Sequence, residues 1–586
     1  MTKDEIADIL ESIAQLLDLK GENPFKIRAY TNAARAIETF AGDFMAMARE
    51  KRLAEIDGIG TSTAEKISEL AITGKLPYYD KLKAEFPASL FDLFELQGLG
   101  GKKIKALYEK LNISSLEQLE KACNDGTVAA LPGFGEKTAA NILKSIEQRK
   151  QHAGQFRLGD VAHDAEQITD DLREHPDVIQ VAVAGSYRRR KEVVHDLDFI
   201  VSTNSPESVS EYFVTHPLVD SIQAQGPTKS SVRLKSGVQA DLRVVTNEQY
   251  PYALVYFTGS KEHNIVLRNR ALQHGWTLNE YRLGPVESKA KYKKTQSASL
   301  PAVREEADLY SALGLDFVPP ELREDRGEFA AAERHELPAL LEKENLRGTF
   351  HNHTTASDGR SSLAEMAGAA QELGLQYLGI ADHSKSSFQA HGLSAEQLLS
   401  QIKEIAKLNK TFEHFKLFTG VECDILKDGS LDFPDEILAQ LDYVVVSVHA
   451  VFNLPEAEMT KRIIRAISNP YVTFLGHLTG RLLLQRDPYQ VNIPAVIEAA
   501  AETGTIIELN ASPHRLDMDW RWWPLAKEKG VKCAINPDAH HTSGLQHLWF
   551  GVAAARKGWL TRSDVVNCLP LGKIESVLKA KRNRKK

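Results

Sequence analysis

The stretch GSYRRRKEVVHDLDFIV, residues 185–201, decides how the middle of the chain folds. Its second half is apolar at both ends, as expected of a strand inside a sheet, yet it holds Asp196 and Asp198 two positions apart. Side chains at i and i+2 of a strand point to the same face about 7 Å apart, so the two carboxylates repel each other and raise a pKa. A divalent metal ion between them is the simplest explanation for this pair.

The surrounding residues 155–245 consist of alternating, β-rich runs that predict one small sheet. A third run, VQADLRVVT, carries Asp241, and the turn with Gly185 and Ser186 lies just before the DLD motif. Three carboxylates on neighbouring strands beside an anion-binding turn predict a two-metal site for phosphoryl transfer, with Mg²⁺ or Mn²⁺. The alternative is that the acids lie at the surface and that RRRK is a solvated turn.

The segment YFTGSKEHNIVLRNRAL, residues 256–272, narrows this prediction. Together with residues 185–201 it resembles the family X DNA polymerases, the group that contains DNA polymerase beta, and the resemblance covers nearly all of residues 1–300. It implies catalytic, metal-binding aspartates at Asp196, Asp198 and Asp241, and contacts to a deoxynucleoside triphosphate from Gly185, Ser186, Arg189, Tyr256, Phe257, Gly259 and Asn264, with Arg268 on the template strand. Tyrosine and phenylalanine form a flat wall against which a ribose 2′-hydroxyl would clash.

Three similar motifs occur near the N-terminus: EIDGIGTSTAEKI at 55, ELQGLGGKKIKAL at 95 and ALPGFGEKTAANI at 130. Each has a Gly-hydrophobic-Gly turn before a helix, and such a turn can grip one backbone phosphate without reading a base. The motif resembles the helix-hairpin-helix, although a single copy can equally be a packing unit. The resemblance implies DNA contacts at the glycine pairs Gly58 and Gly60, Gly98 and Gly100, and Gly133 and Gly135.

The first hairpin region also resembles the lyase domain of family X. NPFKIRAYTNAARAI at 23 followed by the hairpin places Lys66 at the position of the Schiff-base lysine. Relatives with lyase activity carry a second lysine four positions earlier, where this chain has Ser62. An exposed lysine after a hairpin more often contacts phosphate, and a nucleophilic lysine needs a depressed pKa.

The C-terminal part has a different pattern. Eleven of the 19 histidines lie between His351 and His547. Apolar runs such as YLGIADH, DYVVVSVH and KCAINPDAH each end in a potential ligand and precede a helical stretch. Strands alternating with helices, with polar residues at the strand ends, predict a β/α barrel with its site at the C-terminal face.

The motifs HNHTTASDGR, ADH, GVE, SVH, GHL and PDAH are similar to those of the PHP (polymerase and histidinol phosphatase) domain. The similarity implies metal ligands at His351, His353, Asp358, His383, Glu422, His449, His477, Asp538 and His540. This mixed set suits two or three Zn²⁺, Mn²⁺ or Fe ions in a phosphoester hydrolase. Asp382 is expected to orient its neighbour, whereas His391 and His541 lie outside the motif.

We therefore expect a multidomain chain with an α-helical N-terminal part, an α+β nucleotidyltransferase palm with a thumb, and a C-terminal β/α barrel. The expected boundaries are 1–85 for a lyase-like domain, 86–150 for helix-hairpin-helix fingers, 151–245 for the palm, 246–317 for the thumb, 318–346 for an acidic linker, 347–575 for the PHP barrel and 576–586 for a basic tail. The linker and separate ligand sets predict that the two centres work independently.

Composition limits the remaining possibilities. The formal net charge of −7 argues against a uniformly basic nucleic-acid coat, although basic clusters such as RRRK at 188 and KAKYKK at 289 can follow phosphates. No apolar run reaches about 20 residues, so we expect no membrane span and a cytoplasmic protein. We also expect the protein to be a monomer. The four cysteines are widely spaced and predict no disulfide frame.

Joined polymerase X and PHP domains imply gap filling in base excision repair on gapped or primed DNA, with a 3′-5′ exonuclease in the PHP domain. An AP endonuclease or 3′ phosphatase activity stays open for that domain. Two other classes stay open for the whole chain. One is a template-independent nucleotidyltransferase, and the other is a DNA-binding scaffold whose two sites are relics.

Overall fold

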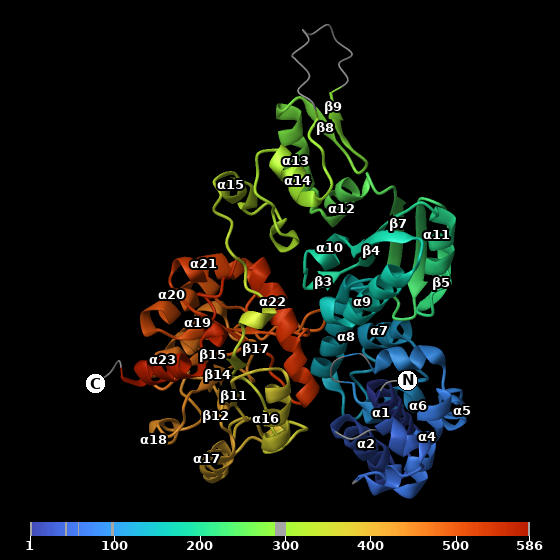
Figure 1. Ribbon diagram of the computed structural model, residues 1–586. Helices are drawn as coiled ribbons and strands as arrows, with labels where there is room; N and C mark the ends of the chain where they lie inside the picture. The colour runs from blue at the N-terminus through green and yellow to red at the C-terminus, as the bar shows by residue number, and fades with distance from the viewer. Residues whose placement is uncertain are drawn as a thin grey trace. The chain divides into compact units, whose positions relative to one another are not determined.

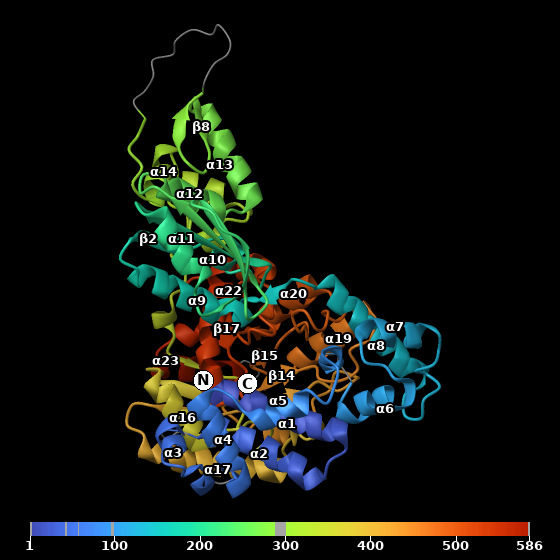
Figure 2. The same ribbon diagram turned by 90° about the vertical axis from the view of Figure 1, so that its right-hand side faces the viewer.

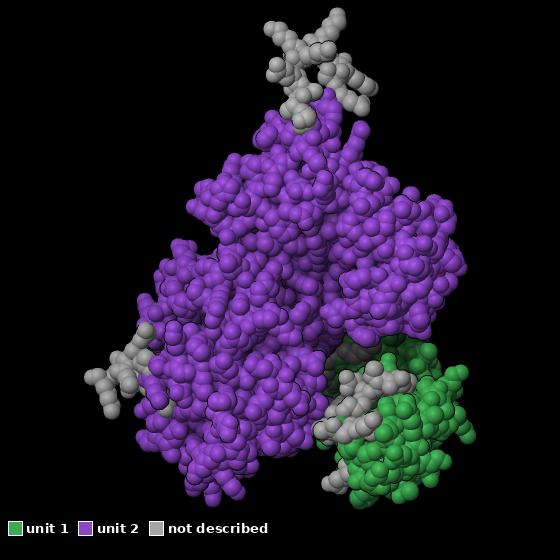
Figure 3. All heavy atoms as spheres, in the orientation of Figure 1, with its two compact units in different colours: residues 1–153 green, residues 154–586 purple. Residues whose placement is uncertain are grey.

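The computed structural model describes residues 3–40, 44–56, 58–94, 96, 99–286 and 300–583. Gly98 and the KAKYKK cluster lie outside these residues. The chain forms two compact units, residues 1–153 and 154–586 (Figure 3). None of the described helices is long and apolar enough to cross a membrane. All four cysteines are buried and unpaired.

The first unit is helical and has two hydrophobic cores, one built from residues 6–82 and one from residues 19–146. Its second helix begins where Asn23 accepts a hydrogen bond from the Phe25 amide and Pro24 takes the first turn, a common helix start. The helices are α1 (Lys3–Lys20), α2 (Pro24–Thr39), α3 (Phe44–Arg49), α4 (Thr61–Thr73), α5 (Pro77–Lys83), α6 (Gly101–Leu111), α7 (Leu116–Asn124) and α8 (Gly135–Gln151).

The palm, at the start of the second unit, is a five-stranded sheet in the order β2-β4-β7-β6-β5 (Figure 1). Only β4 and β7 are parallel in this sheet; the other pairs are antiparallel. The elements are β1 (Phe156–Arg157), α9 (Leu158–Glu174), β2 (Val178–Val183), α10 (Gly185–Arg188), β3 (Val193–Val194), β4 (Asp196–Thr203), α11 (Pro206–Val214), β5 (Val219–Ala224), β6 (Lys229–Leu234) and β7 (Gln239–Val245).

The thumb follows as α12 (Tyr250–Thr258), α13 (Lys261–Gln273), β8 (Trp276–Leu278), β9 (Leu283–Pro285) and α14 (Glu306–Ala312). The segment 318–346, expected to be a linker, is packed against it. Val318, Leu322 and Ala332 complete the thumb core, and α15 (Glu328–Glu333) lies within the segment. The linker prediction is therefore wrong for these residues, because the segment contributes to the thumb core and its charged residues Glu321, Arg323 and Glu328 are buried with polar partners.

A buried ion pair and a buried histidine–glutamate contact explain this packing. Arg323 is fully buried and donates to Glu306 at 2.8 Å and to the Val318 carbonyl at 2.9 Å. Glu328 is fully buried as well and lies 2.8 Å from Nδ1 of His263, whose Nε2 lies 2.8 Å from the Tyr310 hydroxyl.

The C-terminal part has eight parallel-paired strands, with helices around them (Figure 1, Figure 2). The strands are β10 (Gly348–Thr349), β11 (Tyr377–Ile380), β12 (Lys416–Thr419), β13 (Glu422–Asp424), β14 (Val445–Ser447), β15 (Phe474–Leu475), β16 (Ile506–Asn510) and β17 (Cys533–Asn536). The helices are α16 (Leu363–Glu372), α17 (Ala395–Leu408), α18 (Asp435–Leu438), α19 (Glu456–Ile467), α20 (Ile493–Thr503), α21 (Trp523–Glu528), α22 (Leu548–Lys557) and α23 (Leu571–Asn583).

These strands form two sheets, β10-β11-β12 and β13-β14-β15-β16-β17, and not one continuous closed barrel among the described residues. Single bridges, Asn352 to Ala539 and His383 to Glu422, join the sheets where the chain leaves regular strand geometry to present ligands. The expected basic tail is also different, because α23 continues to Asn583 and buries Ile574 and Leu578.

Candidate active sites

The palm aspartates lie on the face of the sheet opposite to helices α9 and α11. Leu197 and Phe199 of β4 belong to the core that those helices cover, so the alternation of a strand turns Asp196 and Asp198 to the other face. In the parallel pairing of β4 with β7, Asp198 stands directly opposite Asp241. The oxygens of the three do not all lie within 4.8 Å of one another, and Asp241 is ion-paired to Lys229 at 2.8 Å.

The electrostatics are those of carboxylates that need a cation. Burial, followed by the charges of Asp196 and Asp241, raises the pKa of Asp198 to about 7. Burial and the Asp241 charge also raise the pKa of Asp196. For Asp241, burial acts to raise the pKa, but hydrogen bonds from Lys229, Ser231 and Gln239 together lower it. Carboxylate oxygens are the donors that Mg²⁺ and Mn²⁺ prefer, so these three residues fit the expected ions.

We expect Asp198→Asn to stabilise the metal-free protein at pH 8. The folded pKa of about 7 lies above the ordinary 3.8, so ionising Asp198 costs the folded state progressively more as pH rises between these values. Above pH 7 the full cost is present, on the order of 4 kcal/mol as an upper limit. Unfolding in EDTA should show a larger gain for the variant at pH 8 than at pH 5. The reverse order would mean that the buried charge of Asp198 does not destabilise the folded state.

The turn before β4 packs tightly against Asp198. Gly185 has φ +61°, and a Cβ atom there would collide with the Asp198 carboxylate, so only glycine fits. Ser186 follows in α10 and is partly exposed. The neighbouring arginines are not a solvated cluster. Arg188 forms a bidentate ion pair with Glu306 at 2.9 and 2.6 Å, and Arg189 contacts Glu324 at 3.1 Å and the Thr258 carbonyl.

The residues predicted to form a wall against the nucleotide lie at the end of α12. The rings of Tyr256 and Phe257 meet edge to face with centroids 5.2 Å apart, and Arg243 from β7 lies 4.9 Å from the Phe257 ring. Gly259 has φ +69° and lies against Arg189. Asn264 donates to the Tyr256 carbonyl at 2.7 Å, whereas Arg268, one turn further along α13, is exposed.

The hairpin glycines precede helices as expected: Gly58 and Gly60 precede α4, Gly100 precedes α6, and Gly133 and Gly135 lead into α8. Positive φ occurs at Gly58, Gly133 and Gly135 but not at Gly60 or Gly100.

Lys66 lies on α4. Its ammonium is 5.7 Å from the Tyr30 ring centroid and 5.1 Å from that of Tyr78, and it hydrogen-bonds to Ser62 at 3.2 Å.

The predicted PHP ligands converge from the carboxyl ends of different strands. They lie after β10 (His351, His353, Asp358), after β11 (His383), at the start of β13 (Glu422), after β14 (His449), after β15 (His477) and after β17 (Asp538, His540). Only Glu422 lies within a strand; the other eight residues lie in the loops that follow the strands, and these loops direct the side chains to one place.

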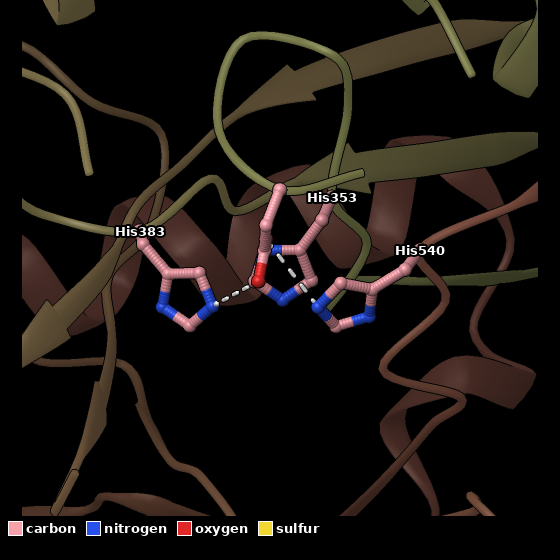
Figure 4. A group of neighbouring side chains, drawn as sticks. His353, His383 and His540 are labelled. Atoms are coloured by element: carbon pink, nitrogen blue, oxygen red, sulfur yellow. Dashed lines mark ion pairs between the residues drawn. The ribbon is translucent and has the colours of Figure 1, made fainter. Parts of the chain in front are cut away.

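Three groups of these residues have ligand atoms within 4.8 Å of one another: His353, Asp358, His383 and His540; His351, His353 and Asp538; and His383, Glu422 and His449. The rings of the first group face a common point (Figure 4). His477 lies outside these groups but its Nε2 is 3.0 Å from Glu422. Because His353 and His383 each belong to two groups, the geometry fits a cluster of two or three ions with shared ligands.

The ring nitrogens show the same fit. Buried His353 Nδ1 has no hydrogen-bond partner among the described residues, whereas His351 Nε2 and His383 Nδ1 face oxygens of Glu422 at 3.3 and 2.9 Å. A buried nitrogen without a partner is costly, and binding to a metal ion relieves that cost. Burial alone raises the pKa of Glu422, yet the charges of His449, His351 and His383 hold that pKa well below its usual value, so the carboxylate stays ionised as a ligand.

Several supporting residues are absent from the predicted set. Glu508 on β16 lies 2.7 Å from Nδ1 of His351 and accepts the His477 amide at 3.0 Å. Asp424 contacts Nδ1 of His449. Such carboxylates fix the ring orientation of a ligating histidine. The apolar run TIIELN, residues 505–510, contains this strand, and alternation from Asn510 back to Glu508 could have identified the residue.

Arg515 is a further residue that the motifs do not indicate. Its Nε lies 3.6 Å from Asp538, and its Nη1 is buried without a hydrogen-bond partner. Asp382, which was predicted to orient its neighbour, instead accepts hydrogen bonds from Thr354, Ser357 and Gln401, and so ties the loop after β10 to α17.

Comparison with known proteins covers the same regions. Family models match for the DNA polymerase beta thumb at residues 253–324, a helix-hairpin-helix domain at 1–76, a SAM-like helix-hairpin-helix tandem at 91–148 and the PHP domain at 349–512. A Leishmania infantum polymerase beta in a ternary complex is 21% identical, with a TM-score of 0.26, over 40% of this chain and 98% of that one.

Two curated relatives extend the comparison. A probable phosphatase of Thermoanaerobacter sp. (strain X514) is 32% identical over 40% of this chain and 95% of its own length. The DNA polymerase/3'-5' exonuclease PolX of Bacillus subtilis (strain 168) is 39% identical over 99% of this chain and 100% of its own length. A match of this extent includes both the palm with its aspartates and the histidine-rich strands, so the chain belongs to the family X DNA polymerases that carry a C-terminal PHP domain.

Proposed function

We propose that this protein is a DNA-directed DNA polymerase that fills short gaps during base excision repair, and that its PHP domain is a 3′-5′ exonuclease. The observation that carries the polymerase function is the register of β4 with β7, which sets Asp198 opposite Asp241 next to the turn that holds Arg189. The B. subtilis relative is named for both activities.

In the palm, Asp196, Asp198 and Asp241 would hold Mg²⁺ or Mn²⁺, which when bound supplies charge neutralisation for the triphosphate and activates the primer 3′-hydroxyl. Ser186 and Arg189 would bind the triphosphate from the turn that follows β2. Arg268, exposed on α13, is free to reach the template strand, and the hairpin glycines would grip the DNA backbone.

In the PHP domain, the nine predicted ligands would hold two or three Zn²⁺, Mn²⁺ or Fe ions, which supply a hydroxide for attack on a phosphodiester. Glu508 and Asp424 would orient the ligating rings. AP endonuclease and 3′ phosphatase activities remain alternatives for this site, and the similarity to a probable phosphatase is consistent with the latter.

Primer extension tests this proposal and separates it from the two alternatives. Insertion on a one-nucleotide gapped duplex but not on a single strand without template supports a template-directed polymerase. Equal insertion without template would indicate a template-independent transferase, and no insertion would indicate a relic scaffold. Mass spectrometry of the metals in the purified protein would identify the ions. Lyase activity, a monomeric state and the domain boundaries other than the linker and the tail stay predictions.

We expect Tyr256→Ala to raise ribonucleotide incorporation relative to deoxyribonucleotide about tenfold, because the wall against a 2′-hydroxyl loses one of its two rings. Single-nucleotide kinetics with paired ribo- and deoxyribonucleotides measure the ratio. Tyr281→Ala, which removes an exposed thumb tyrosine, is the matched control and should keep the wild-type ratio. An unchanged ratio in Tyr256→Ala would place discrimination elsewhere, in the backbone at Phe257.

A further inference from the structure

The turn that precedes the palm aspartates is held by the PHP domain. Arg190 lies 4.5 Å from the ring of Trp549 at the start of α22. Glu192 accepts hydrogen bonds from the indole of Trp520 at 3.1 Å and from Arg521 at 2.9 Å. The segment that carries the proposed triphosphate contact Arg189 therefore has PHP side chains on its C-terminal side.

Glu324 is the centre of this contact. One of its oxygens accepts from Nε of Arg189 at 3.1 Å and from the ammonium of Lys557 at 2.6 Å, and its other oxygen lies 3.6 Å from Lys191. Only 11% of the Glu324 side chain is exposed. A carboxylate this deeply buried is stable only while a cation accompanies it.

Lys557, the last residue of α22, is buried beside Glu324. Its side chain is 0% exposed. Its ammonium has three acceptors, namely Glu324 Oε1 at 2.6 Å, the Arg189 carbonyl at 3.0 Å and the Glu321 carbonyl at 3.4 Å. Lys557 thus contacts both the backbone of Arg189 and the carboxylate that holds the Arg189 side chain.

We propose that Lys557, a PHP-domain residue, is a positioning residue for nucleotide insertion in the palm. It anchors the Arg189 backbone, and it keeps Glu324 ion-paired when Arg189 turns from Glu324 to the incoming triphosphate. Without Lys557, the departure of Arg189 would leave the buried Glu324 carboxylate with Lys191 as its remaining cation. Glu324 would therefore compete with the triphosphate for the Arg189 guanidinium. This inference rests on the proposed role of Arg189 in the polymerase.

Lys557→Met in the full-length protein is expected to raise the KM for the incoming nucleotide about tenfold, with kcat within about threefold of wild type. Exonuclease activity on single-stranded 3′ ends should not change, since Lys557 touches no PHP ligand. Lys557→Arg keeps a cation beside Glu324 and should recover most of the loss. Lys532→Met removes an exposed lysine of the same domain and serves as the matched control.

The double variant Lys557→Met with Glu324→Gln separates this role from a structural one. If Glu324 competes for Arg189, removing its charge should return the KM to within about threefold of wild type. An unchanged KM in Lys557→Met, a joint fall of kcat and exonuclease activity, or a double variant as impaired as the single one would each overturn the proposal.

Should Lys557→Met fail to fold, Glu324→Gln alone and the double variant decide the question. Both should have a KM within about threefold of that of wild type, and a larger rise in either would refute the competition. A wild-type protein without insertion on gapped DNA would instead refute the polymerase function itself, so the two failures are distinguishable.

Discussion

Asp198→Ala is expected to reduce nucleotide insertion about a thousandfold or more, while affinity for gapped duplex DNA stays near that of wild type. Asp198 stands between Asp196 on its own strand and Asp241 opposite, so its loss opens both metal positions. Interactions that stabilise the charge of a phosphoryl-transfer transition state contribute far more to rate than to ground-state binding. In the proposed function, the grip on DNA would come from backbone amides and basic side chains elsewhere. Single-turnover insertion and a fluorescence-anisotropy titration measure the two quantities.

Asp220→Ala is the matched control, because Asp220 is an exposed aspartate on β5 of the same sheet. It should insert nucleotides at the wild-type rate. Residual insertion within tenfold of wild type in Asp198→Ala would contradict the metal role. Loss of DNA affinity together with insertion would mean that Asp198 mainly maintains the fold of the palm.

The positions of the two sites could be predicted because strand periodicity and strand ends are local properties of the sequence. Alternation alone places Asp196 and Asp198 on one face, and each apolar run before a histidine ends where the structure ends a strand. The exact register that sets Asp198 opposite Asp241 depends on how β4 and β7 pair, which is a tertiary property.

Charge was the least reliable guide. The acidic segment 318–346 and the RRRK cluster were each interpreted as solvated or phosphate-binding, because charged residues are mostly exposed. In the structure these opposite charges meet, as Arg189 with Glu324 and buried Arg323 with Glu306. Partners 135 residues apart, such as Arg189 and Glu324, cannot be matched from composition. A chain that ends at residue 320 would lack Leu322 of the thumb core, and Arg189 would lack its partner Glu324.

The second large effect is expected in the PHP domain. His351→Ala with His353→Ala should abolish the exonuclease and lower the bound metal. The rings of these two residues are 5.1 Å apart and fully buried, and together they enter two of the three ligand groups. Removing both rings leaves Asp538 as the one ligand of its group, and it takes His353 away from the group with Asp358, His383 and His540. A metal cluster does not keep its geometry without these ligands. Degradation of a labelled single strand and mass spectrometry of the metals measure the losses.

The same variant tests how far the two centres depend on each other. His414→Ala, an exposed histidine of the domain, is the control and should keep both activities. Insertion on gapped DNA should stay within about threefold of wild type, because the contact that Lys557 makes with the palm uses the end of α22 and no metal ligand. Loss of insertion in a variant that remains folded by circular dichroism would mean that the metal cluster itself, and not only α22, supports the palm. The double histidine variant is expected to keep insertion and lose the exonuclease, while Lys557→Met raises the KM. Together these two results would locate the coupling between the domains at the Glu324 contact.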